Sequence, residues 1–153
     1  GKDDFLLDTT RAAYRLVQSG ALRRHANLKI ILAHAGGFLP YASHRLMAAL
    51  LAEGGRSPVD LLEDLRSFYF DTALSGSPAA LPSLLAFAKP GHVLFGSDWP
   101  QSESLEFNSY PNVIGVARAF VATKGAAAMD KVFWKNSVKP YRWVKRDAAQ
   151  RRA

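Results

Sequence analysis

Three short, nearly continuous apolar segments constrain the fold of this chain more than any other feature. They are "LKIILAH" (28–34), "FYFDTAL" (68–74) and "HVLFGSD" (92–98). Each is short and rich in aliphatic or aromatic residues, which predicts a strand that is buried on both faces. Helical patterns lie between them, and alternation of strands and helices is typical of a parallel sheet. We therefore predict an α/β fold.

The predicted helices have recognisable ends. Ser57-Pro58 and Ser77-Pro78 each combine a capping serine with a proline suited to the first helical position. Gly20 is placed to end the helix before the first strand. Helical patterns also cover segments 8–20, 39–55, about 111–123 and about 126–137.

Composition excludes several classes of protein. The 153 residues suffice for one substantial core, and no cysteine is present, which rules out disulfides and thiolate chemistry. No apolar run approaches the ~18 residues of a membrane span, so we expect no membrane partner. The absence of cysteine makes an intracellular, cytoplasmic location our default expectation. The polar start lacks an initiator Met and does not resemble a signal peptide, so the sequence can begin inside a longer chain.

Positive charge is concentrated at the C-terminal end. Residues 131–153 hold eight of the 20 Lys and Arg but only one acid, and the rest of the chain is balanced. We interpret 139–153 as a solvated basic tail that follows a single domain at 1–138. A polyanion-binding tail is the alternative, but no nucleic-acid motif accompanies it, and we predict no nucleic-acid partner.

A polar residue follows each of the three predicted strands. These residues are His34, Asp71 and Asp98. In parallel sheets the chemistry lies beyond the carboxyl ends of the strands, so we expect the three side chains to share one site. A histidine exchanges protons near neutral pH, and an aspartate can bind a metal or accept a proton.

The motifs "LAHAGG" and "LFGSDWP", with "FYFDTALSGSPAALPSLLAF" between them, resemble the metal-dependent amidohydrolase superfamily. The similarity covers about residues 5–137. It is to the amidohydrolase-2 branch, which includes aminocarboxymuconate-semialdehyde decarboxylase. It implies a (β/α)₈ TIM barrel, of which this chain would supply the C-terminal portion with about strands six to eight.

The resemblance also implies roles for individual residues. Asp98 matches the acid after the eighth strand, which binds or approaches a divalent metal, here taken as zinc. His34 matches a histidine that polarises metal-bound water or shuttles a proton. Arg45 matches an arginine that reaches a substrate carboxylate in a neighbouring subunit. Asp71 and Trp99 would line the substrate site.

The other metal ligands of the family have no counterpart in this sequence. None of the four histidines stands two residues from another, so the His-x-His pair of the first strand is absent. A catalytic zinc usually has three protein ligands. We therefore expect that this chain alone neither binds metal tightly nor turns over substrate.

The leading prediction is a metal-dependent decarboxylase of a small aromatic or unsaturated carboxylic acid, present as a C-terminal fragment. One alternative is a metal-dependent hydrolase of a lactone or amide. Another is a non-catalytic half-barrel. The expected partners are a small carboxylated substrate and either further copies of the chain or a separate N-terminal half. His25, His44 and His92 are expected on the surface.

Overall fold

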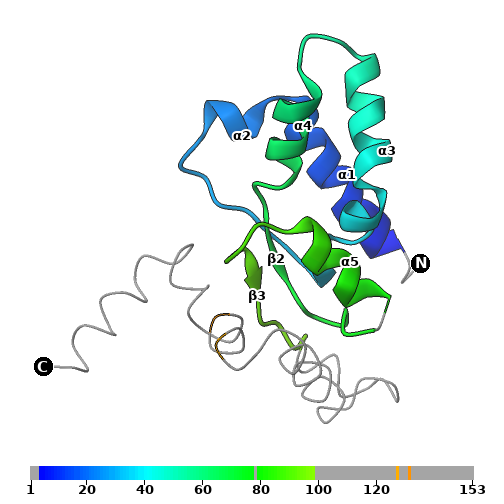
Figure 1. Cartoon of the computed structure of the whole chain (residues 1–153), viewed down its shortest axis with the longest axis vertical. Helices are drawn as coiled ribbons and strands as arrows, with labels where there is room; N and C mark the ends of the chain where they lie inside the picture. Colours follow the sequence, from blue (N-terminus) through cyan, green and yellow to red (C-terminus); the bar gives the residue numbers. More distant parts are fainter. Residues whose placement is uncertain (1–3, 78, 99–126, 128–130, 132–153) are drawn as a thin grey trace, which may run out of the picture.

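The computed structural model describes residues 4–77 and 79–98, together with 127 and 131. Its strands follow the predicted order, and helices separate them along the chain (Figure 1). The predicted helices at 111–123 and 126–137, the basic tail 139–153 and Trp99 lie outside the described residues, apart from positions 127 and 131. The helices are α1 (Asp4–Gln18), α2 (Ala21–Arg24), α3 (Leu39–Ala52), α4 (Pro58–Leu65) and α5 (Ala80–Phe87), and a short 3₁₀ turn, η1, spans His34–Gly36; the strands are β1 (Ile31–Leu32), β2 (Tyr69–Asp71) and β3 (Val93–Leu94).

The three strands form one parallel sheet in the order β1-β2-β3, which confirms the predicted α/β arrangement. Phe70, at the middle of β2, is paired with Leu32 on one side and with Val93 on the other. The strands are shorter than the apolar segments that encode them. The first one ends before His34, which begins the turn η1 instead of closing a strand.

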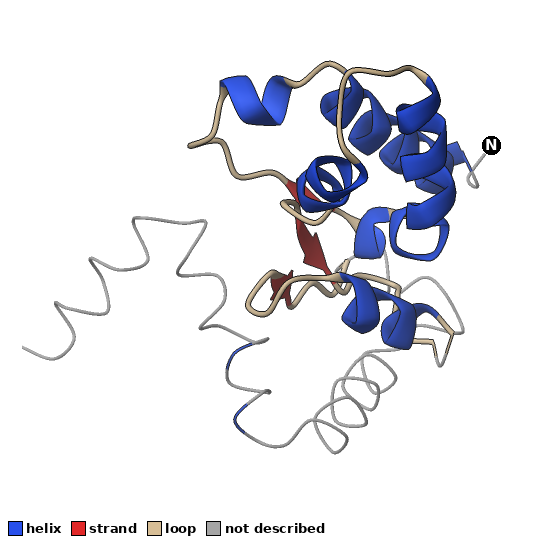
Figure 2. Cartoon of the chain, turned by 45° about the horizontal axis from the view of Figure 1, so that its top comes forward, coloured by secondary structure: helices blue, strands red, loops and turns tan. Residues whose placement is uncertain are grey.

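The core lies between the sheet and the helices (Figure 2). Phe70 is fully buried and meets the ring of Phe87 edge-on at a centroid distance of 5.9 Å. Helices α1, α3 and α4 pack on one another, and α5 contacts α3. Fully buried apolar side chains from five elements and one loop fill this space: Val17, Leu39, Leu61, Leu65, Phe68, Phe70 and Leu84.

Local sequence explains where the helices begin. The Ser57 hydroxyl accepts a hydrogen bond from the Asp60 amide at 3.1 Å, as the predicted cap requires. Ser77 accepts one from Ala80 at 3.0 Å. Helix α1 begins at Asp4, earlier than the predicted segment 8–20. Within the described residues, no helix has the length and apolar character needed to cross a membrane.

Candidate functional site

The carboxylate of Asp71 is the centre of the candidate site. It stands at the carboxyl end of the middle strand, where β2 pairs with Leu94 of β3. Its Oδ1 accepts two backbone hydrogen bonds, from His34 at 2.8 Å and from Ala73 at 3.1 Å. One carboxylate oxygen therefore joins the end of the first strand to the loop after the second.

His34 lies in an unusual backbone turn. Four successive residues, His34 to Gly37, have positive φ angles of 52°, 57°, 77° and 63°. Left-handed backbone costs roughly 1–2 kcal/mol for a residue with a side chain, and such residues cluster at functional sites. The His34 ring lies close to the next loop, with Nδ1 3.2 Å from the carbonyl oxygen of Ala73.

The glycines and helix α1 hold this turn in place. A Cβ at Gly36 would lie 2.9 Å from the Phe70 ring, so only glycine fits over the middle strand. One residue beyond Gly37, the amide of Phe38 donates to the Thr10 hydroxyl at 2.9 Å, and that hydroxyl donates to the Leu6 carbonyl. The position of His34 is thus set both by the sheet and by the helix beneath it.

The end of β3 approaches the same carboxylate. The Gly96 amide donates to the Thr72 hydroxyl at 3.2 Å, and this hydroxyl lies 3.3 Å from the Gly96 carbonyl. A Cβ on Gly96 would stand 3.0 Å from the Cβ of Asp71. Asp98 follows two residues later with a φ of 57°. Each strand is therefore followed by a non-glycine residue with left-handed backbone: His34 after β1, Leu74 after β2 and Asp98 after β3.

The electrostatic surroundings of Asp71 favour its neutral form. Burial is the largest effect and raises the pKa of this carboxyl above its ordinary value. Hydrogen bonds from the Ala73 and His34 amides and the charge of His34 act in the opposite direction. The negative charge of Asp98 is a further, smaller cause that raises the pKa of Asp71.

The structure brings together part of the predicted site. His34 and Asp71 are in direct contact, and Asp98 follows β3, the strand that pairs with the strand of Asp71. Arg45 is exposed on α3 and forms no ion pair with any described residue. The hydrogen bonds of Ala73 to Asp71 and of Thr72 to Gly96 were not predicted. Their part in the site comes from backbone atoms and a hydroxyl, which leave no distinctive pattern in the sequence.

The described residues do not make a metal site by themselves. Among residues 4–77 and 79–98, no three His, Cys, Asp or Glu side chains gather where they could hold an ion. A catalytic zinc usually takes three protein ligands.

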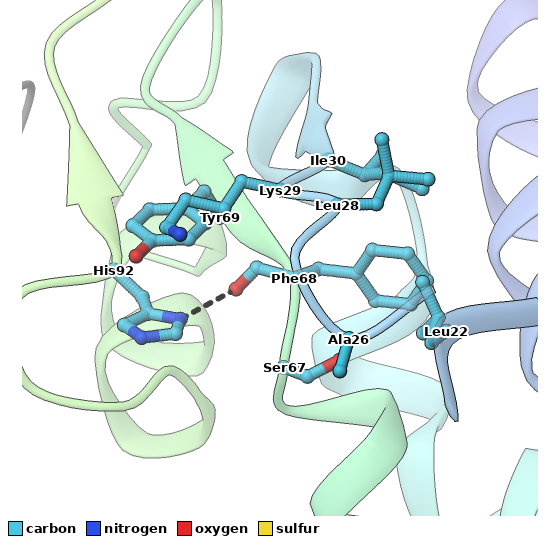
Figure 3. Close-up of a pocket in the computed structure, with 9 residues that line it drawn as sticks. All are labelled: Leu22, Ala26, Leu28, Lys29, Ile30, Ser67, Phe68, Tyr69 and His92. Carbon is cyan, nitrogen blue, oxygen red and sulfur yellow. Dashed lines mark hydrogen bonds between the residues drawn. The ribbon is translucent and has the colours of Figure 1, made fainter. Parts of the chain in front are cut away.

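His92 corrects an expectation of surface exposure. Its ring is stacked on Tyr69 at a centroid distance of 4.1 Å, and its Nδ1 lies 2.9 Å from the Phe68 carbonyl oxygen (Figure 3). Both residues line a cavity of about 200 Å³ at the amino ends of the strands, opposite the candidate site. The other lining residues are Leu22, Ala26, Leu28, Lys29, Ile30, Ser67 and Phe68. His25 and His44 are exposed as expected.

Comparison with known proteins decides the family. The amidohydrolase family model Amidohydro_2 matches residues 5–143. The chain belongs to the amidohydrolase family. It is 48% identical over 102 residues to 6-methylsalicylic acid decarboxylase of Penicillium expansum, a match that covers 65% of this chain and 32% of that enzyme. The chain thus spans about a third of the length of this curated relative.

Solved structures share the fold of this chain over about two fifths of their own length. The 5-carboxyvanillate decarboxylase of Sphingomonas paucimobilis superposes with a TM-score of 0.69 at 23% identity, over 90% of this chain and 40% of that one. A dihydroxybenzoic acid decarboxylase from a Polaromonas species, solved with bound manganese, superposes with a TM-score of 0.67 at 23% identity. This match covers 86% of this chain and 39% of that one. At these identities the likeness concerns the fold alone, and these neighbours are TIM-barrel amidohydrolases.

Proposed function

We propose that this chain is the C-terminal portion of a metal-dependent barrel decarboxylase in the amidohydrolase-2 branch, similar to aminocarboxymuconate-semialdehyde decarboxylase. Its substrate would be a small aromatic or unsaturated carboxylic acid. The observation that carries the proposal is the contact between His34 and Asp71 at the carboxyl ends of the parallel strands, with Asp98 placed after the neighbouring strand β3. The similarity to a 6-methylsalicylic acid decarboxylase adds the substrate class.

The residues of this chain would divide the chemistry between them. In decarboxylation the bond between the ring carbon and the carboxylate breaks, carbon dioxide leaves, and the ring carbon keeps the electron pair and takes a proton. His34 is the described side chain at this edge best suited to deliver that proton near neutral pH. Asp71, which interacts with both His34 and Asp98, would face the substrate with its second oxygen, Oδ2.

A divalent ion, zinc in our proposal, would be held partly by Asp98. Such an ion supplies Lewis-acid polarisation of a bound oxygen when present. Its remaining ligands would come from outside the described residues, since these contain no group of three suitable side chains. Metal titration of this chain by calorimetry should accordingly show no tight stoichiometric site, and a tight one-to-one site for zinc or manganese would contradict this.

A segment exchange tests the function itself. The matched segment of this chain replaces its counterpart in the Penicillium expansum enzyme, and release of carbon dioxide from 6-methylsalicylic acid is measured. We expect turnover without incorporation of water oxygen, and a loss of about 10²–10⁴-fold on His34→Ala or Asp98→Asn. His44→Ala, on an exposed histidine, is the matched control.

Two results of this exchange would refute the proposal. One is a folded, metal-loaded exchanged enzyme whose carbon dioxide release is unchanged by His34→Ala. The other is an enzyme that incorporates water oxygen into its product, since a lactone or amide hydrolase does so and a decarboxylase does not.

Arg45 would act on the substrate carboxylate across an interface between copies. Its guanidinium is exposed and forms no ion pair within the described residues, and arginine binds carboxylates through two parallel hydrogen bonds. Mixing inactive Arg45→Ala and inactive His34→Ala forms of the exchanged enzyme should restore partial activity. Failure of the mixture to recover any activity, with both variants assembled, would contradict the role across an interface.

A further inference from the structure

Three contacts link His34, Asp71 and Ala73 into a closed loop. Asp71 Oδ1 accepts from the amide of His34 and from the amide of Ala73. The Ala73 carbonyl oxygen in turn lies 3.2 Å from Nδ1 of His34. The carboxylate therefore fixes both the backbone that carries the ring and the peptide that the ring contacts.

The chemistry of this contact determines which nitrogen carries the proton. A carbonyl oxygen only accepts hydrogen bonds, so an unprotonated Nδ1 at this distance would set two lone pairs against each other. The same oxygen also accepts a hydrogen bond from the buried Ser75 hydroxyl at 2.8 Å, which fixes its position. Nδ1 must then be the protonated nitrogen of the neutral ring, which leaves Nε2 as the basic one.

We propose that Asp71 is a positioning residue that holds His34 as the Nδ1–H tautomer and leaves Nε2 to exchange the proton of the reaction. The contacts of His34 and Asp71 do not depend on which reaction is catalysed. Only the use of Nε2 rests on the proposed function.

Backbone strain supports this assignment. His34 and Leu74 have φ angles of 52° and 50°, and Leu74 lies directly after the Ala73 peptide that the ring contacts. Left-handed backbone at non-glycine residues persists only where the surroundings impose it. The two Oδ1 hydrogen bonds connect these two strained turns, since one amide belongs to His34 itself and the other to the residue before Leu74.

The tautomer can be measured on the chain itself. With ¹⁵N-labelled histidine, a multiple-bond proton–nitrogen NMR spectrum at alkaline pH distinguishes a protonated ring nitrogen from a basic one. We expect a protonated Nδ1 and a basic Nε2 for His34, while the exposed His25 and His44 show the averaged pattern of a free ring. A His34→Gln sample assigns the signal. A basic Nδ1 in His34 of the unmodified chain would overturn the proposal outright.

Two substitutions at Asp71 separate positioning from folding. Asp71→Asn keeps an acceptor oxygen at Oδ1 and should keep the tautomer, whereas Asp71→Ala should give the averaged pattern. Backbone amide spectra report whether each variant is folded. An averaged pattern in a folded Asp71→Asn variant, or an unchanged tautomer in a folded Asp71→Ala variant, contradicts the role.

The exchanged enzyme adds a kinetic measurement. Loss of a residue that orients a functional side chain typically lowers activity by about 10–100-fold. Asp71→Ala should therefore lower kcat by about that factor with little change in KM, and Asp71→Asn should retain most of the kcat of the unmodified enzyme. A rise in KM with unchanged kcat would mean that Asp71 binds substrate only. If the exchanged enzyme proves not to be a decarboxylase, the tautomer result still stands, so the two failures are distinguishable.

Discussion

Two partly buried aspartates of this chain have opposite surroundings. Asp64 on α4 is 8% exposed and faces two guanidinium groups, with Arg23 Nε 2.9 Å from its Oδ2 and Arg56 also in contact. Among the described residues, only backbone amides donate hydrogen bonds to Asp71, and no Lys or Arg forms an ion pair with it. The carboxylate of Asp64 is paired with arginines and secures the fold, whereas the carboxylate of Asp71 is held at a strand end by neutral donors and has a raised pKa.

The ion pairs of Asp64 join separate elements of the helical layer. Arg23 comes from α2 and also reaches Asp60, while Arg56 precedes α4 and donates to the Val17 carbonyl of α1 at 2.8 Å. Asp64 thus connects three helices. The contacts of Asp71 instead connect strand ends, with strained backbone on either side.

The largest expected loss of stability follows removal of the Asp64 carboxylate. Asp64→Ala leaves Arg23 and Arg56 without their shared partner, and breaking a buried pair typically costs about 3–5 kcal/mol. Urea unfolding followed by circular dichroism measures this. Glu63→Gln, on the same helix but in an exposed pair with Lys89, is the control and should change little. Equal losses for the two variants would remove the distinction between the regions.

A smaller loss is expected where β3 meets Asp71. Gly96→Ala places a methyl group 3.0 Å from the Asp71 Cβ, and overpacking of this kind costs about 1–3 kcal/mol. The displacement should also disturb the His34 signal in the histidine NMR spectrum. If both the His34 signal and the stability are unchanged, the backbone at Gly96 does not lie against the Asp71 side chain.

The smallest effect is the pH dependence of Asp71. Its pKa is raised above the ordinary 3.8 in the folded state, so the folded chain binds this proton more tightly than the unfolded chain. That contribution to stability is fully present below about pH 3.8 and is lost as the pH rises through the raised pKa. Asp71→Asn should therefore gain stability relative to the unmodified chain as the pH rises through this range. A relative loss would contradict the raised pKa.

Much of the fold could be predicted from the sequence because it depends on local patterns. The apolar segments, separated by helical patterns, predicted the three strands and their parallel arrangement. Ser57 predicted where α4 begins. The short extent of the strands could not be predicted, since the left-handed backbone at His34 and Asp98 is imposed by contacts made after folding. His92 was assigned to the surface, and its stacking with Tyr69 was missed, because the register between neighbouring strands sets that contact and local sequence does not reveal the register.

The candidate site was predictable to a similar degree. Polar side chains at strand ends identify His34, Asp71 and Asp98 without any structure, because parallel strands bring their carboxyl ends to one edge. The partners that orient them are the Ala73 peptide, the Thr72 hydroxyl and the bare Cα of Gly96. Such groups occur throughout any sequence, so only the three-dimensional arrangement reveals them.

The most direct test compares one substitution in the two regions. Asp64→Asn and Asp98→Asn are introduced separately into the exchanged decarboxylase. Carbon dioxide release is then measured per folded molecule, with the folded fraction taken from circular dichroism. We predict that Asp64→Asn lowers stability but leaves kcat of the folded enzyme unchanged, and that Asp98→Asn lowers turnover by about 10²–10⁴-fold while the protein remains folded. Full turnover by folded Asp98→Asn would contradict the assignment of chemistry to the strand ends.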